Sequence, residues 1–306
     1  MNMGGSGIAP SFAAVYGAHL ISRKRAVILF TIFVVLGSLT FGSKVAKTLG
    51  SGFFPKELFT IQVALIILAS AAISLFVANI IKIPQSTSWV TVAATIGASI
   101  YFNSLNLNTT VQMISMWFLL PFIGFFLTLF IFKIIYPPRQ SNFWFFEKVH
   151  LWKKQIHIFA LISSCYVAFA IGSNNVANAV GPLMGANIVS PILGLLLISP
   201  LFGAGAWVIN DRTMKTIGKE IVPLGLVTST LVSFVTATLL IFASILGFPQ
   251  SLVQLNTLAI VAIGTIKHQH VFAAGESVVK KTFFVWMIAP LVSGILSYLL
   301  LNIFGV

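Results

Sequence analysis

Charged residues are scarce in this sequence of 306 residues. Only 8% of the residues are charged, five are acidic and one is cysteine, while 58% are hydrophobic. A chain of this composition has too little polar surface to enclose its apolar residues in water, which excludes an ordinary soluble domain. The single cysteine, Cys165, lies in an apolar run and provides neither a disulfide framework nor a thiolate metal site. We therefore expect no metal and no cofactor.

Long apolar runs dominate the chain. They cover residues 26–41, 60–81, 113–135, 157–171, 223–246 and 282–303. Each approaches or exceeds the roughly 20 residues that a helix needs to cross the hydrocarbon core. This pattern predicts an all-α, polytopic transmembrane helix bundle in the cell inner (cytoplasmic) membrane.

The net charge of +13 comes from lysines and arginines in short connecting segments. Such placement is typical of side chains that contact lipid headgroups and orient the protein in the membrane. No basic stripe is interleaved with exposed aromatic residues, so we expect no nucleic-acid partner.

The sequence contains an internal repeat. Residues 4–55 align without a gap on residues 172–223, with identities that include Gly4/Gly172, Lys47/Lys215, Gly50/Gly218 and Pro55/Pro223. A second block follows in each copy, where Pro-Gln-Ser occurs at 84–86 and at 249–251. The segment 136–155 is the least apolar stretch, so we predict one transmembrane repeat over residues 1–150 and another over 151–306.

The two copies differ at their beginnings. Arg23 to Arg25 in the first copy fall opposite an apolar stretch in the second, which suits repeats inverted in the membrane. An apolar segment precedes Gly172, whereas three residues precede Gly4. We therefore expect that the first repeat lacks an N-terminal half-helix and that the natural protein begins before Met1.

A glycine-rich motif opens each copy. Residues 172–187 place three asparagines inside an apolar run, and the equivalent segment 4–19 carries small and glycine residues instead. Glycines permit an unwound backbone whose N–H groups face an anion, although small polar residues also serve as helix-packing contacts. The candidate anion-binding residues here are Gly5, Ser6, Gly7, Asn174, Asn175 and Asn178.

The Pro-Gln-Ser segments are the second pair of candidate motifs. Proline, hydroxyls and amides followed by a short apolar stretch predict a re-entrant segment with a polar tip. Hydroxyls that bond their own helix would also give this pattern. The candidate residues are Gln85, Ser86, Thr87, Ser88, Gln250, Ser251 and Gln254.

None of the five acidic residues lies in these motifs. Sulfate offers only acceptor oxygens, whereas hydrogen phosphate also carries a proton that a carboxylate could accept, so a donor-only site favours sulfate. The sequence contains no HExxH, GxSxG or P-loop pattern, and its histidines have no evident carboxylate partner. We therefore do not expect an enzyme.

The segment GSNNVANAVGPL at 172–183 closely resembles the GANDVANA-type signature of the inorganic phosphate transporter family, and IPQSTSWVTV at 83–92 resembles its PVSTTHA-type element. The resemblance implies two inverted repeats that hold an anion near the membrane midplane. The signature aspartate is replaced by Gly7 and Asn175, the first-copy asparagines by Ser6 and Pro10, and the second hydroxyl run continues as Leu252, Val253 and Gln254. These departures resemble the sulfate permease branch and argue against sodium coupling.

The sequence thus predicts a secondary transporter that imports sulfate by alternating access, with protons as the coupling ion and a homodimer as the assembly. Phosphate or another oxyanion, such as thiosulfate or molybdate, is the alternative within transport. A non-transporting membrane scaffold subunit is the alternative of another class.

Overall fold

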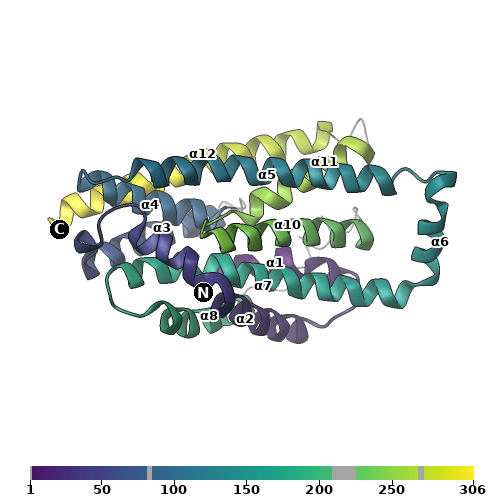
Figure 1. Ribbon diagram of the computed structural model, residues 1–306, viewed down its shortest axis with the longest axis horizontal. Helices are drawn as coiled ribbons and strands as arrows, with labels where there is room; N and C mark the ends of the chain where they lie inside the picture. The colour runs from purple at the N-terminus through teal and green to yellow at the C-terminus, as the bar shows by residue number, and fades with distance from the viewer. Residues whose placement is uncertain (1, 81–84, 209–224, 268–271) are drawn as a thin grey trace.

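The computed structural model describes residues 2–80, 85–208, 225–267 and 272–306, and within them every regular element is helical (Figure 1). Seven of the described helices are long and apolar enough to cross a membrane. The helices of the first half are α1 (Asn2–Gly17), α2 (Arg23–Ser51), η1 (Lys56–Leu58), α3 (Ile61–Ile80), α4 (Thr87–Tyr101), α5 (Leu107–Ile135), η2 (Gln140–Asn142) and α6 (Phe143–Leu151). Those of the second half are α7 (Lys153–Gly185), α8 (Pro191–Val208), α10 (Leu226–Leu246), α11 (Leu252–Lys267) and α12 (Phe272–Phe304).

The helices form an elongated bundle with two distinct ends (Figure 1). The Asn106 N–H before α5 donates to the Phe53 carbonyl after α2 at 2.8 Å, so the end of α2 and the start of α5 lie together. We call this the Lys56 end, after the residue in the adjoining turn. The opposite end, where α2 begins and where α6 lies, is the Arg23 end.

Glycines allow α2 and α7 to pack with their backbones in contact. A Cβ at Gly37 would overlap the Phe169 carbonyl, and one at Gly172 would overlap the Val34 backbone. At the Lys56 end, a Cβ at Gly50 would lie 2.6 Å from the Gly181 carbonyl oxygen. Small-residue seams of this kind are how helices associate closely in lipid, and this seam joins the two halves along the length of the bundle.

The predicted halves are interlaced rather than separate. The helix α4 of the first half packs on α12 of the second, where Gly97 approaches the Gly294 backbone and the Ser293 hydroxyl donates to the Val90 carbonyl at 3.0 Å. In return, α11 of the second half packs on α5 of the first. Residues 1–150 and 151–306 therefore share one core.

The helices α4 and α11 are too short to cross a bilayer. They contain 15 and 16 residues, which at 1.5 Å per residue gives about 22–24 Å against a hydrocarbon core of about 30 Å. The helix α4 runs to the Lys56 end, where the Phe102 ring after it stacks on Phe54. Both helices begin inside the bundle, as the re-entrant interpretation of the Pro-Gln-Ser segments requires.

Of the two interpretations of the glycine motifs, the structure shows helix packing rather than an unwound backbone. The helix α7 continues from Lys153 to Gly185 through the entire asparagine-containing segment, and Gly4 to Gly7 lie inside the continuous helix α1. The physical reason is that these glycines serve close helix packing, which needs a missing side chain but not a broken backbone. Among the described residues, the interruptions fall at the Pro-Gln-Ser tips.

Candidate functional site

The starts of α4 and α11 meet inside the bundle. Ser86 caps α4 by accepting the Trp89 N–H at 3.2 Å, and Ser251 accepts the Gln254 N–H at 3.2 Å at the start of α11. The Ser88 hydroxyl then donates to the Gln250 carbonyl at 3.0 Å and links the two starts. We call the segments 85–89 and 248–254, together with Asn174 and Asn178, the tip cluster.

Asn174 anchors the second tip to α7. Its Nδ2 donates to the Ser244 hydroxyl at 2.9 Å and to the Phe248 carbonyl at 3.0 Å, and its Oδ1 accepts the Gln250 N–H at 2.9 Å. An irregular backbone buried in a membrane protein needs such partners because no water is available. Both amide hydrogens of Asn174 are committed, so its role is to position the tip.

Asn178 connects α7 to the first tip. It lies one helical turn after Asn174 on the same face, and its Nδ2 donates to the Thr87 hydroxyl at 3.3 Å and the Ser88 hydroxyl at 3.1 Å. Ser88 is therefore occupied as both donor and acceptor. Thr87 keeps its own hydroxyl hydrogen available.

Two tryptophans complete the cluster. The Trp117 Nε1 on α5 donates to the Pro249 carbonyl at 2.8 Å, which together with Asn174 fixes three successive residues of the second tip. The Trp117 ring stacks on Trp89, with centroids 4.4 Å apart and an interplanar angle of 21°. The stacked pair presents the Trp89 indole N–H, which is buried and has no hydrogen-bond partner in the described part of the chain.

Several buried polar atoms of the cluster have no acceptor or donor among the residues that the structure describes. The Gln250 side chain is fully buried, and both its Nε2 and its Oε1 are unpartnered. The same holds for the Oε1 atoms of Gln85 and Gln254 and for Asn178 Oδ1. The hydroxyls of Ser86, Thr87 and Ser251 accept hydrogen bonds but donate none. Buried polar groups are usually satisfied, so this concentration of unmet hydrogen-bonding capacity indicates a ligand site.

The cluster is electrically neutral but polarised. Within the tip cluster as defined there is no carboxylate, lysine, arginine or histidine, and the described residues contain no group of three potential metal ligands. The first turns of α4 and α11 have backbone N–H groups without acceptors in their own helix. The positive ends of the two helix dipoles lie at the same place. Such a site favours an anion, and its donors suit oxyanion oxygens.

Most of the predicted candidate residues lie in the tip cluster, but those of the first glycine motif do not. Ser6 is exposed and its hydroxyl donates to the Met3 carbonyl of its own helix at 2.9 Å. Gly5 is buried within α1, and Gly7 faces Phe30 and Ile171. Asn175 is half-buried on another face of α7, with its Oδ1 unpartnered. Gly5 and Gly7 therefore lie on the packed side of α1, which contacts α2, α7 and α8, whereas Ser6 faces outward.

Sequence reasoning missed three residues of the site. Trp89 and Trp117 stack across two helices, and Ser244 supports Asn174 from the end of α10. The signal available for Trp89 was its position directly after the hydroxyl run of the first tip. Trp117 and Ser244 lie in apolar runs far from either motif, and only the fold brings them there.

A helical bundle in which two half-length helices begin at a buried, donor-rich and neutral cluster defines a membrane carrier for a small anion. The model of the phosphate transporter family matches residues 3–297, and the chain belongs to that family. It is accordingly a multi-pass membrane protein and an anion transporter rather than an enzyme.

Individual relatives agree with this assignment. The chain is 36% identical to the sulfate permease CysP of Bacillus subtilis over 99% of its own length and 84% of that protein, which indicates the cell inner membrane. It is 24% identical to the putative phosphate permease MJ0630 of Methanocaldococcus jannaschii over 97% of its length and 92% of that protein. The solved structure of a sodium-dependent phosphate transporter has the same fold, with a TM-score of 0.85 at 22% identity over 99% of this chain and 95% of that one.

Proposed function

We propose that this protein imports sulfate and that the tip cluster is its anion-binding site. The observation that carries the proposal is the set of buried hydrogen-bond donors without acceptors at the start of two helices. These donors are the hydroxyls of Ser86, Thr87 and Ser251, the Trp89 indole N–H and the Gln250 amide. The relationship to a sulfate permease supports the same substrate.

Sulfate suits this donor set because it needs donors and offers no proton. A dianion in a low-dielectric site is costly unless hydrogen bonds and dipoles replace its hydration. The two helix starts provide those dipoles, and the neutral side chains release the anion more readily than paired arginines would. Asn174 and Asn178 hold the tips in place rather than contacting the anion.

Phosphate is the second candidate. The amide oxygens of Gln250 and Gln254 are unpartnered acceptors, which could receive the proton of hydrogen phosphate. Of the relatives named above, one is a putative phosphate permease and another is a sodium-dependent phosphate transporter. Direct competition between the two anions therefore decides the substrate.

Import of sulfate requires an energy source. At 100 mV, inside negative, about 2.3 kcal/mol opposes each inward negative charge, so an uncoupled dianion would leave the cell. We propose protons as the coupling ion. The tip cluster supplies no carboxylate for sodium, and Asn175 and Gly7 occupy the positions where the related motif has aspartate.

Alternating access is proposed on the arrangement of the helices. The helix α2 begins at the Arg23 end, whereas its repeat counterpart α8 runs the opposite way, with Gly42 beside Leu195 and Gly203 beside Thr31. Helix pairs of opposite direction are what inverted repeats produce, and inverted repeats allow one site to open to either side in turn. A homodimer is the expected assembly, and the mass of the protein in detergent, measured by light scattering, tests it.

The test is radiolabelled sulfate uptake into proteoliposomes, with excess unlabelled phosphate and with a pH gradient imposed or omitted. We expect uptake that resists phosphate and increases when the outside is acidic. Uptake abolished by phosphate would assign the site to phosphate instead. Uptake unaffected by the pH gradient would refute proton coupling, and no uptake of either anion would refute transport.

A further inference from the structure

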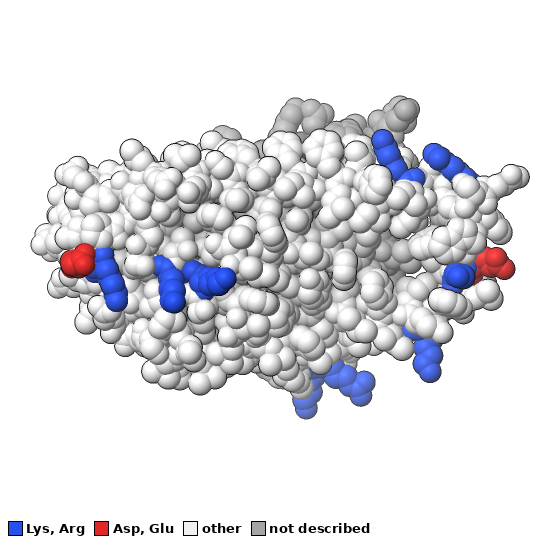
Figure 2. All heavy atoms as spheres, viewed as in Figure 1, with Lys and Arg blue, Asp and Glu red and all other residues white. Residues whose placement is uncertain are grey.

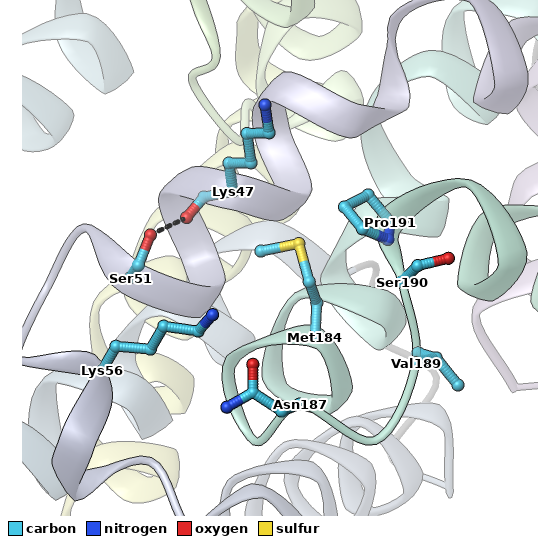
Figure 3. Close-up of a pocket in the computed structure, with 8 residues that line it drawn as sticks. All are labelled: Lys47, Ser51, Lys56, Met184, Asn187, Val189, Ser190 and Pro191. Carbon is cyan, nitrogen blue, oxygen red and sulfur yellow. Dashed lines mark hydrogen bonds between the residues drawn. The ribbon is translucent and has the colours of Figure 1, made fainter.

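A polar pocket lies near the surface at the Lys56 end, away from the tip cluster (Figure 3). It has a volume of about 490 Å³ and is lined by Lys47, Ser51, Lys56, Met184, Asn187, Val189, Ser190 and Pro191. These residues come from the last turns of α2, the turn η1, the end of α7, the connection that follows it and the start of α8. Since a water occupies about 30 Å³ of liquid, the pocket accommodates a small oxyanion together with part of its hydration shell.

The pocket carries positive charge without a partner. Lys47 and Lys56 are exposed, and neither forms a salt bridge with any residue that the structure describes, although Glu57 directly follows Lys56. Figure 3 shows Lys56 extending toward Met184 and Asn187, while the Lys47 ammonium extends away from these residues. Ser190 lies just before α8, so the positive end of that helix dipole adds to the same field.

The charge distribution assigns this end to the outside of the cell. The Arg23 end carries the cations in and around α6 and at the starts of α2 and α7, which are Arg23, Lys24, Arg25, Lys133, Arg139, Lys148, Lys153 and Lys154. Most of the visible surface between the two ends is uncharged (Figure 2). Basic residues concentrate on the cytoplasmic side of membrane proteins, so the Arg23 end is cytoplasmic. Lys47 and Lys56 then lie on the outer side, where the preference for cytoplasmic basic residues does not explain them. Their positive charge therefore needs another explanation.

We propose that the Lys47–Lys56 pocket is an outer vestibule that captures the oxyanion before it reaches the tip cluster. The inference rests on the proposed function for the identity of the anion. Asn187 lies nine residues after Asn178, which places the pocket about 13 Å along the bundle from the cluster. Between them the α2 and α7 backbones are in contact at Gly50 and Gly181, and Met184 forms the floor of the pocket. Capture at the vestibule therefore precedes a movement that opens this seam.

The ligand chemistry is that of a tetrahedral oxyanion, and a phospholipid headgroup shares it with free sulfate. Free sulfate is the source we propose, because the pocket adjoins the α2–α7 seam that leads to the tip cluster. Positive charge lining an entrance raises the local anion concentration and the rate of capture, and salt screens this effect. The vestibule therefore affects uptake most at low sulfate concentration and low ionic strength.

The first experiment measures sulfate uptake by full-length Lys56→Gln, Lys47→Gln and the double variant. Lys24→Gln is the matched control, because it removes the same charge from an exposed residue at the other end. We expect the double variant to raise KM by about threefold to tenfold at low salt with little change in maximal rate, and the difference to shrink at high salt. Lys56→Gln has the larger single effect. Variants that transport like Lys24→Gln would overturn the inference while leaving the proposed function intact.

The second experiment does not need transport. Amine-reactive labelling of Lys47 and Lys56 is followed by mass spectrometry in nanodiscs of zwitterionic lipid, with and without sulfate, and in nanodiscs containing anionic lipid. Protection by sulfate in zwitterionic lipid supports the vestibule, even if the wild type takes up no sulfate and the proposed function fails. Protection by anionic lipid alone assigns the pocket to a headgroup and overturns the inference, as does the absence of any protection.

Discussion

The two glycine motifs have the same packing role and different polar chemistry. Gly172 contacts the Val34 backbone, and Gly4 contacts the Phe202 backbone. The offset that relates Gly4 to Gly172 also relates Val34 to Phe202, so the repeat preserves a contact as well as a sequence. Yet Asn174 and Asn178 hold the tip cluster, whereas their counterparts Ser6 and Pro10 do not.

This comparison separates what a repeated motif needs for assembly from what it needs for a site. Close helix packing leaves no room for a side chain at Gly4 or at Gly172, the equivalent glycines that both copies carry. A polar anchor is needed where an irregular tip must be satisfied, and of the two glycine motifs the second provides the anchors seen among the described residues, while Trp117 on α5 is an anchor outside both motifs. The predictions below test this division, from the largest expected effect to the smallest.

Asn174→Leu and Ser6→Leu replace equivalent residues of the two motifs. Asn174→Leu removes three hydrogen bonds and leaves a buried carbonyl and N–H unsatisfied. We expect uptake to fall by about 100-fold or more, since interhelical hydrogen bonds in membranes contribute about 1 kcal/mol each and unmet groups cost more. Ser6→Leu should retain wild-type uptake. Equal loss in both variants, measured at matched protein content, would refute the unequal roles.

Gln250→Leu tests whether an unpartnered amide serves the substrate. Because neither polar atom of this side chain forms a hydrogen bond with a described residue, an apolar replacement of similar size should leave the melting temperature unchanged or higher. Uptake should nevertheless fall by about tenfold or more through the loss of donors to the anion. Thermal unfolding and uptake are measured on the same preparation. A variant that loses stability in proportion to uptake would indicate a structural amide instead.

Much of this architecture was predictable, because membrane composition, the repeat and the Pro-Gln-Ser tips all leave strong sequence signals. The sequence also singled out Asn174, Asn178 and both tips, which the fold brings together, and their binding of an anion stays a prediction. It could not separate anchors from free donors, because that depends on which amide hydrogens are already committed in the fold. Nor could it show that α7 continues through its glycines, since a glycine that permits unwinding also permits close packing.

Gly172→Ala and Gly4→Ala should destabilise the protein to a similar extent. In both cases the added Cβ overlaps the backbone of the facing helix, which must shift, and overpacking of this kind costs about 1–3 kcal/mol. Gly264→Ala on α11 is the control, because nothing lies within 4 Å of its Cβ position. Melting temperatures in detergent provide the measurement. If only Gly172→Ala lowers the melting temperature, the two motifs do not share a packing role.

Trp117→Phe measures how far anchoring of the second tip depends on residues outside the glycine motif. The variant keeps the ring that stacks on Trp89 but removes the Nε1 donor to the Pro249 carbonyl, a bond of 2.8 Å. Since a single hydrogen bond contributes about 1 kcal/mol, uptake should fall by about fivefold. The double variant Asn174→Leu/Trp117→Phe measures whether the effects of the two substitutions on uptake depend on each other. If the double variant loses less uptake than the product of the two single losses, both residues hold the same tip. If the losses multiply, Trp117 acts on transport independently of Asn174, the anchor in the second motif.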